Sequence, residues 1–348
     1  MKKYSMYLWV ALIVISMPVT LYAQMGMGKI EEIESVKGRK LIVMIEEPRE
    51  RILKRIEKKP KLGSVEDYKA DLAKYNANIK EVVEKFWPYN KAGIQYKTFD
   101  EIRALAKTKT TEYAVVACIS MKASNYHSGY VLNNGLHWVK DIKDDFEDRN
   151  DKMFTSILVN TIEDFGGAPV YHTPLFDVFP SKAGLVYGVR AIEAYFAMRI
   201  KNKKDGEKRR DLNEQAMAAM AARAPQIANK TLIVRSEWLD EDLNEKNIKN
   251  VYPYPYKVVD RDEMDRIVMA QDAKYAYAVV LPYVVSSSHS NFVLYFHYIM
   301  DAADSQSSAF VKPSQGAAMG AAYSGKAGHT NFTEKIFTKM TEQISGKK

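Results

Sequence analysis

The sequence has little cysteine and lacks the short motifs that most often mark a nucleotide site or a catalytic serine. Cys118 is the only cysteine in 348 residues, so no internal disulfide can form and apolar cores must hold the fold together. Its place between apolar residues of an expected strand indicates an inert, buried thiol. Neither G-x-G-x-x-G nor G-x-x-x-x-G-K-[ST] is present, and the G-x-S-x-G elbow is missing as well. Nucleotide binding is therefore not expected.

The six histidines give no zinc signature. No two of them stand four residues apart, and no cysteine joins them at ligand spacing. His127, His137 and His172 do fall in one part of the chain, near several aspartates, and could meet in space. We predict no metal or other cofactor, and keep these three as the metal candidates. Surface or loop histidines without a partner are the preferred interpretation.

The chain has only a mild charge excess. Its net charge is +8, which looks spread out and helps solubility but does not imply nucleic-acid binding. The most basic stretch runs from Pro48 to Lys61, where Ile52 and Ile56 form one apolar edge. Such a helix could face anions or lipid headgroups. A solvated helix with one docked edge is the preferred interpretation.

The first 23 residues have the layout of a secretory signal peptide. Lys2 and Lys3 precede an uncharged apolar run, Pro18 interrupts it, and Ala23 suits cleavage. We predict cleavage after Ala23, a periplasmic or secreted protein, and no stable membrane span once the signal is removed. A retained anchor is the alternative, because the uncharged run approaches the roughly 20 residues that a spanning helix needs.

Apolar runs alternate with amphipathic segments from residue 39 onward, and this pattern occurs twice. Five short matches recur in the same order: Leu41-Ile42-Val43 with Leu232-Ile233-Val234, Tyr96-Lys97 with Tyr256-Lys257, Asp100-Glu101 with Asp262-Glu263, Tyr113-Ala114-Val115-Val116 with Tyr277-Ala278-Val279-Val280, and Pro180-Ser181 with Pro313-Ser314. Matches in conserved order indicate an internal duplication. Strands separated by helices favour parallel βαβ units, and two strands without a helix between them favour an antiparallel pair.

The predicted fold class is α/β, with two tandem duplicated, three-layer-like domains that have mixed sheets and the order β-α-β-α-β-β-α. The expected organisation is a signal peptide over 1–23, a flexible lead-in over 24–38, a first domain with insertions over 39–204, a linker and helix over 205–229, and a second domain with a C-terminal helix over 230–348. This order of elements resembles small α/β domains of bacterial envelope proteins, such as the amino-terminal domain of TolB and the periplasmic domain of the curli secretion channel. The resemblance brings no functional residue with it.

An aromatic and proline-rich segment is the most conspicuous local feature. Tyr252, Tyr254 and Tyr256 alternate with prolines, and Trp87-Pro88-Tyr89 occupies the matching place in the first copy. These five aromatic residues could form an interaction surface for a peptide or glycan. A structural role at the joint between a helix and the next strand is the preferred interpretation.

Two hypotheses about function follow. The first is an exported, non-enzymatic interaction or structural module that contacts an envelope protein or a glycan. The second is a hydrolase or metal-dependent enzyme with a site in the first-domain insertion or between the domains. The sequence does not specify the partner, the substrate or the oligomeric state.

Overall fold

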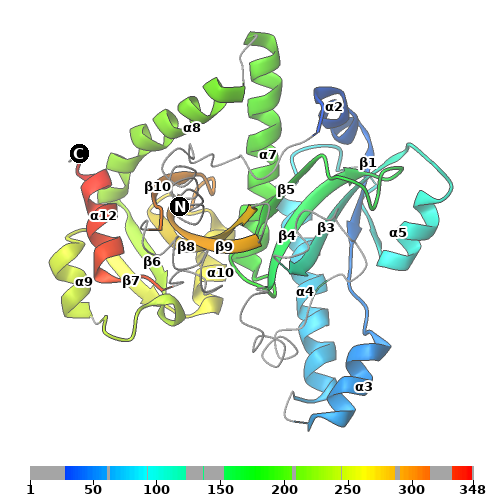
Figure 1. Ribbon diagram of the computed structural model, residues 1–348, viewed down its shortest axis with the longest axis horizontal. Helices are drawn as coiled ribbons and strands as arrows, with labels where there is room; N and C mark the ends of the chain where they lie inside the picture. Colours follow the sequence, from blue (N-terminus) through cyan, green and yellow to red (C-terminus); the bar gives the residue numbers. More distant parts are fainter. Residues whose placement is uncertain are drawn as a thin grey trace, which may run out of the picture. The chain divides into compact units, whose positions relative to one another are not determined.

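The computed structural model describes residues 28–60, 63–91, 93–122, 136, 153–205, 209–243, 245–286, 291–313 and 331–346 (Figure 1). The chain divides into two compact units, a first unit of Met25–Lys204 and a second unit that begins at Asp205. Within the described ranges, no helix is both long and apolar enough to cross a membrane.

The first unit contains a five-stranded mixed sheet in the order β2-β1-β3-β4-β5. Its strands are β1 (Lys40–Met44), β2 (Gln95–Lys97), β3 (Tyr113–Lys122), β4 (Met153–Thr161) and β5 (Tyr171–Pro174). β1 is the middle strand of the parallel set β2-β1-β3, and the middle strand of the parallel set in each sheet is called the central strand below. β3, β4 and β5 pair in antiparallel fashion. Apolar runs without alternation suit β1 and β3 because helices cover both faces of this part of the sheet.

The helices of the first unit are α2 (Ile30–Gly38), α3 (Glu50–Lys58), α4 (Val65–Phe86), α5 (Phe99–Ala106) and α7 (Lys182–Asp205). Ser64 caps α4, since its side chain accepts a hydrogen bond from the Asp67 backbone N–H. Helix α5 packs on one face of the sheet through Ile102, and α7 packs on the other face, where Gly188 lies over Ile157. The result is three layers.

Helix α2 differs from the flexible lead-in expected over residues 24–38. It occupies Ile30–Gly38, and its buried residues are Ile33 and Val36. Two apolar residues three apart make a very short stripe, so the sequence pattern gave little sign of a docked helix.

The second unit repeats the arrangement of the first. Its sheet has the order β10-β9-β8-β6-β7, with the central strand β6 parallel to β7 and β8, and with β8, β9 and β10 antiparallel. The strands are β6 (Thr231–Arg235), β7 (Tyr256–Val259), β8 (Tyr275–Ser286), β9 (Asn291–Asp301) and β10 (Ser307–Val311). The helices are α8 (Arg209–Arg223), η3 (Ala224–Asn229), η4 (Ser236–Trp238), α9 (Glu245–Val251), α10 (Arg261–Ala270) and α12 (Glu334–Ile344).

The α/β class with two similar mixed-sheet parts is thus confirmed. Each sheet has one antiparallel strand more than the expected order, namely β5 and β10. The core of the second unit lies where Ile248 of α9 and Phe337 of α12 meet Leu232 and Val234 of β6.

The strand pairing places two of the five sequence matches differently. Lys40 is opposite Tyr113, and Thr231 is opposite Tyr275, so Tyr113 corresponds to Tyr275 rather than to Tyr277. In the same way Val43 is opposite Tyr96 while Val234 is opposite Val258, which shifts the Tyr96 match by two residues. A shift of two keeps each side chain on its face of the sheet, so the burial pattern alone cannot reveal it.

A third match keeps its position. Thr98 accepts a hydrogen bond from the Glu101 N–H at the start of α5, and Asp260 accepts one from the Glu263 N–H at the start of α10. Both caps directly follow an edge strand, so Asp100-Glu101 and Asp262-Glu263 occupy the same place in the two units.

Candidate functional site at the carboxyl ends of the central strands

The carboxyl ends of β1 and β6 are where an α/β sheet would be expected to bind a ligand. Each is a central strand with parallel neighbours on both sides, and ligands in open α/β sheets bind beyond the carboxyl ends of such strands. Both ends carry a buried ionic side chain. In the first unit this side chain is Glu46, two residues after β1, and in the second unit it is Arg235, the last residue of β6.

Glu46 is held by four hydrogen bonds from three segments. Arg49 Nη2 donates to Oε2 at 2.7 Å, and the Leu136 N–H donates to Oε1 at 2.9 Å. The Asn76 side chain of α4 accepts from the Glu46 N–H at 2.9 Å and donates to the Glu46 carbonyl at 2.8 Å. Since a side-chain amide presents a donor and an acceptor like a peptide group, Asn76 continues the pairing of β1 beyond its last residue.

Burial sets the protonation behaviour around Glu46. Burial raises the pKa of Glu46 above its usual range, while Arg49 and the Leu136 N–H pull the pKa down in part. Tyr75 and Cys118 lie close by, and burial raises the pKa of Tyr75 as well. Burial also raises the pKa of the Cys118 thiol to about 12, so this group is not a thiolate at neutral pH. The prediction of an inert cysteine agrees with this environment.

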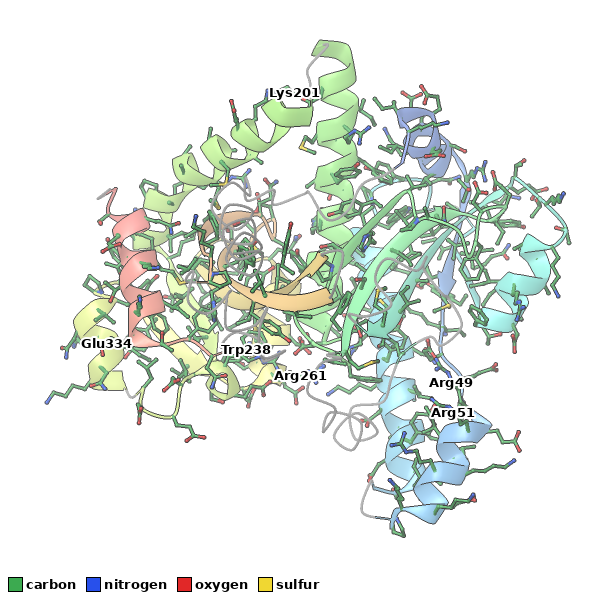
Figure 2. All side chains as sticks on the ribbon, in the orientation of Figure 1. Arg49, Arg51, Lys201, Trp238, Arg261 and Glu334 are labelled. Carbon is green, nitrogen blue, oxygen red and sulfur yellow. The ribbon has the colours of Figure 1, made fainter. Side chains whose placement is uncertain are left out.

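Arg235 is the charged side chain at the matching end of β6. Only 2% of its side chain is exposed, and its guanidinium carbon lies 4.1 Å from the centre of the Trp238 ring. Glu237, which is largely exposed, forms its ion pair. Trp238, which Figure 2 labels, is the last residue of η4, the short helix that directly follows Arg235. Such a stacked and paired arginine is desolvated at low cost, because both its charge and its planar face have a partner.

The segment after Trp238 closes the second unit. The Phe332 N–H donates to the Trp238 carbonyl at 2.7 Å, and the Asp240 N–H donates to the Phe332 carbonyl at 3.0 Å. His297 of β9 lies edge-on to Phe332, with its Nε2 at 3.1 Å from the Asn331 carbonyl. This histidine therefore belongs to the docking of residues 331 and 332 on the sheet.

The three metal candidates are only partly visible. The interpretation of His172 as a surface or loop histidine is wrong, because His172 is buried on β5, opposite Leu158 of β4. His127 and His137 lie outside the described residues. In the part of the chain that the structure describes, no group of three His, Cys, Asp or Glu side chains could hold a metal ion.

The aromatic candidates divide into core and half-buried residues. Trp87 and Tyr252 are 1% and 0% exposed, so neither can contribute to an interaction surface of the folded protein. Tyr89, Tyr254 and Tyr256 are half-buried. They remain candidates for such a surface.

The two aromatic joints have nearly the same geometry. The rings of Trp87 and Tyr89 are 5.3 Å apart at 84°, and those of Tyr252 and Tyr254 are 5.4 Å apart at 80°. Tyr89 packs on Phe196 of α7, whereas Tyr252 packs on Phe337 of α12. Each joint thus lies against the last helix of its unit, as the structural interpretation expects.

No family model matches the chain, and no curated protein or solved structure is significantly similar to it. Its function must therefore be argued from its own residues.

Proposed function

We propose that the chain is an exported, non-enzymatic protein that arose by duplication of one α/β unit. It works as an interaction or structural module in the bacterial envelope or outside the cell. The partner is an envelope protein or a glycan, and the signal peptide is removed after Ala23.

The arrangement at the carboxyl ends of β1 and β6 carries the non-enzymatic part of the proposal. At the place where α/β sheets usually bind ligands, Glu46 ties β1 to α3, α4 and Leu136, and Arg235 stacks on Trp238. Both ionic groups are thus used to hold the connection that follows the central strand. A general acid, general base or anion-binding group would need an open side facing substrate.

Matching contacts support the duplication. The residue directly before β1 and the residue directly before β6 each pair with a carboxylate near the end of the fourth strand, Arg39 with Glu163 and Lys230 with Asp301. The two carboxylates are not at equivalent positions, because the sheet register makes Asp301 correspond to Thr161. The backbone N–H after that strand also donates to the equivalent tyrosine carbonyl, from Ile162 to Tyr113 at 3.1 Å and from Ala302 to Tyr275 at 3.1 Å. The backbone bonds continue the antiparallel ladders and follow from the topology. The cation–carboxylate pair is not required by the topology, so its occurrence in both units favours common descent over convergence on one fold.

Two measurements test export and the absence of catalytic metal. The chain is expressed in a bacterium with its first 23 residues intact, and the mass of the protein in the periplasm or medium is measured. We expect Gln24 as the first residue, and an unprocessed chain confined to the cytoplasm would contradict export. Metal analysis of the same protein should show neither zinc nor iron. A stoichiometric metal that is lost when His127, His137 and His172 are replaced by Ala would establish the enzyme hypothesis instead.

The interaction role is tested on the half-buried tyrosines. Tyr254→Ala and Tyr256→Ala should weaken binding to envelope fractions or glycan arrays in protein that circular dichroism shows to be folded. Some loss of stability is expected as well, because both rings also pack against the core. The matched control is Lys257→Ala, an exposed position on β7 between the same elements. Binding at the wild-type level by both tyrosine variants and by the control would exclude this surface.

A further inference from the structure

The sequence has two strongly basic stretches, residues 49–61 and residues 201–210, and the first of them is the more basic. Residues 205–348 contain 18 Lys and Arg against 18 Asp and Glu, so the whole excess of +8 lies in residues 1–204. Without Lys2 and Lys3 the excess is +6, and residues 49–61 hold seven Lys and Arg against two Glu, which is +5 of it. Residues 201–210 hold six Lys and Arg against two acids, so the positive charge is clustered in these two stretches rather than spread evenly.

The basic segment of residues 49–61 forms α3 and its flanks. Ile52 and Ile56 are buried against Tyr68 and Leu72 of α4, which makes a small apolar cluster between the two helices. The apolar edge of α3 is thus used inside the unit. The exposed cations of the segment are Arg51, Lys54, Lys58 and Lys59. Lys54 forms an ion pair with Glu50 at 2.7 Å, but both side chains are well exposed, so this pair leaves the charge largely available to a partner.

The α3–α4 hairpin is an addition to the plan that the two units share. The first unit connects β1 to β2 through α3 and the 22 residues of α4, whereas the second unit connects β6 to β7 through η4 and the seven residues of α9. In Figure 1, α3 and the beginning of α4 extend past the sheet of the first unit. Figure 2 labels Arg49 at its base, where it pairs with Glu46, and Arg51 in the first turn of α3.

We propose that the exposed cations of the α3 segment form a docking surface for a bilayer rich in anionic lipids. Three of the four exposed cations are lysines, and Ile52 and Ile56 are not available for insertion, so the attraction acts on headgroups without penetration of the acyl region. Specific protein interfaces are depleted in lysine and enriched in aromatic residues and arginine. A lysine-rich, convex helix therefore suits a lipid surface better than a shaped protein groove.

The proposal deepens the envelope role proposed above and rests on it for its setting. The two can fail separately, because vesicle binding can be absent from a protein that is exported and metal-free. A basic segment near an anionic leaflet gains roughly fivefold in affinity for each Lys or Arg. Replacing Lys54, Lys58 and Lys59 by Gln should therefore lower the partition coefficient on the order of a hundredfold.

The test is sedimentation of the chain from Gln24 onward with vesicles of phosphatidylcholine that contain about 30 mol% phosphatidylglycerol at about 0.1 M salt. The matched control replaces Lys246, Lys249 and Lys335 by Gln, which removes the same charge from exposed positions in the second unit. Wild type and control should bind, the α3 variant should not, and pure phosphatidylcholine or about 1 M salt should abolish binding. Circular dichroism and protection of the Cys118 thiol show whether each variant is folded.

Three outcomes overturn the proposal. Folded wild-type protein fails to sediment with the anionic vesicles, or the α3 variant and the control lose binding equally. In the third outcome, wild type binds polyglutamate and the α3 variant does not, while neither wild type nor the variant binds the vesicles. That result would assign the surface to an acidic protein.

Discussion

Gly188 offers the sharpest test of how the last helix of the first unit packs. A Cβ atom at this position would lie 2.4 Å from Ile157 Cγ2 and 3.0 Å from Leu175 Cδ2. Ile157 is 0% exposed in the middle of β4, so the sheet or the helix must shift to admit a methyl group. Overpacking of this kind costs about 1–3 kcal/mol. Alanine in a helix interior returns about 0.5–1 kcal/mol of conformational free energy.

We therefore expect Gly188→Ala to lower the free energy of unfolding of the first unit by about 0.5–2 kcal/mol. Gly184→Ala is the comparison variant in the first turn of the same helix, because the nearest atoms to its Cβ would be Ser181 Oγ at 3.2 Å and Phe176 at 3.5 Å, a milder contact than at Gly188. The comparison variant should be neutral or slightly stabilising. The difference between the two variants removes most of the helix propensity and leaves the packing of α7 on the sheet.

The single thiol supplies the assay. Cys118 is 0% exposed on β3 of the first unit, so its reaction with a thiol reagent across a urea series reports the opening of that unit alone. Burial raises the pKa of the thiol to about 12, and unfolding returns it toward about 8.5, which increases the contrast. If Gly188→Ala protects Cys118 as well as Gly184→Ala does, the close approach of α7 to Ile157 is wrong.

Three further variants test the site and the joints. Glu46→Gln should change the pH dependence of stability. Because the pKa of Glu46 is raised in the folded protein, protonated Glu46 stabilises the fold in acid. This contribution is lost as the pH rises above the ordinary pKa of 4.5 and through the raised pKa. Wild type should thus lose stability relative to the variant over that rise, and parallel urea curves at all pH values would exclude a raised pKa. Trp87→Ala and Tyr252→Ala should each lower the free energy of unfolding by about 3–5 kcal/mol, because both rings are fully buried. A loss of less than about 1 kcal/mol, measured by urea unfolding with circular dichroism, would contradict a core position for these rings.

Local signals carried most of the fold prediction. The apolar runs of β1, β3 and β6 are set by neighbours in sequence, so their strand type followed from the pattern alone. The register between the two units did not follow from the pattern. Tyr275-Ala276-Tyr277-Ala278 repeats with a period of two, and both registers put the same residue types on the same face. Only the pairing of Thr231 with Tyr275 decides between them.

The candidate site was beyond sequence reasoning for a different reason. Glu46 and Arg49 stand three residues apart just after an apolar run, which is a visible signal of a charged strand end. Nothing in that signal says which of the two is buried. The deciding contacts come from Asn76, 30 residues on, and from Leu136, 90 residues on. Burial of a charge depends on such distant partners, and a local pattern does not contain them.

Comparison of the two strand ends favours a structural origin for their charges. In the register set by the sheets, Met44 corresponds to Arg235 and Glu46 to Glu237. The first unit buries the carboxylate and leaves its arginine partly exposed, whereas the second buries the arginine and leaves its carboxylate exposed. A reaction or a shared ligand would constrain which charge faces inward, but closing a strand end requires only that the buried charge has a partner. Arg49 also begins the α3–α4 hairpin, which has no counterpart among the described residues between β6 and β7, so the buried Glu46 anchors the longer connection of the first unit at its base.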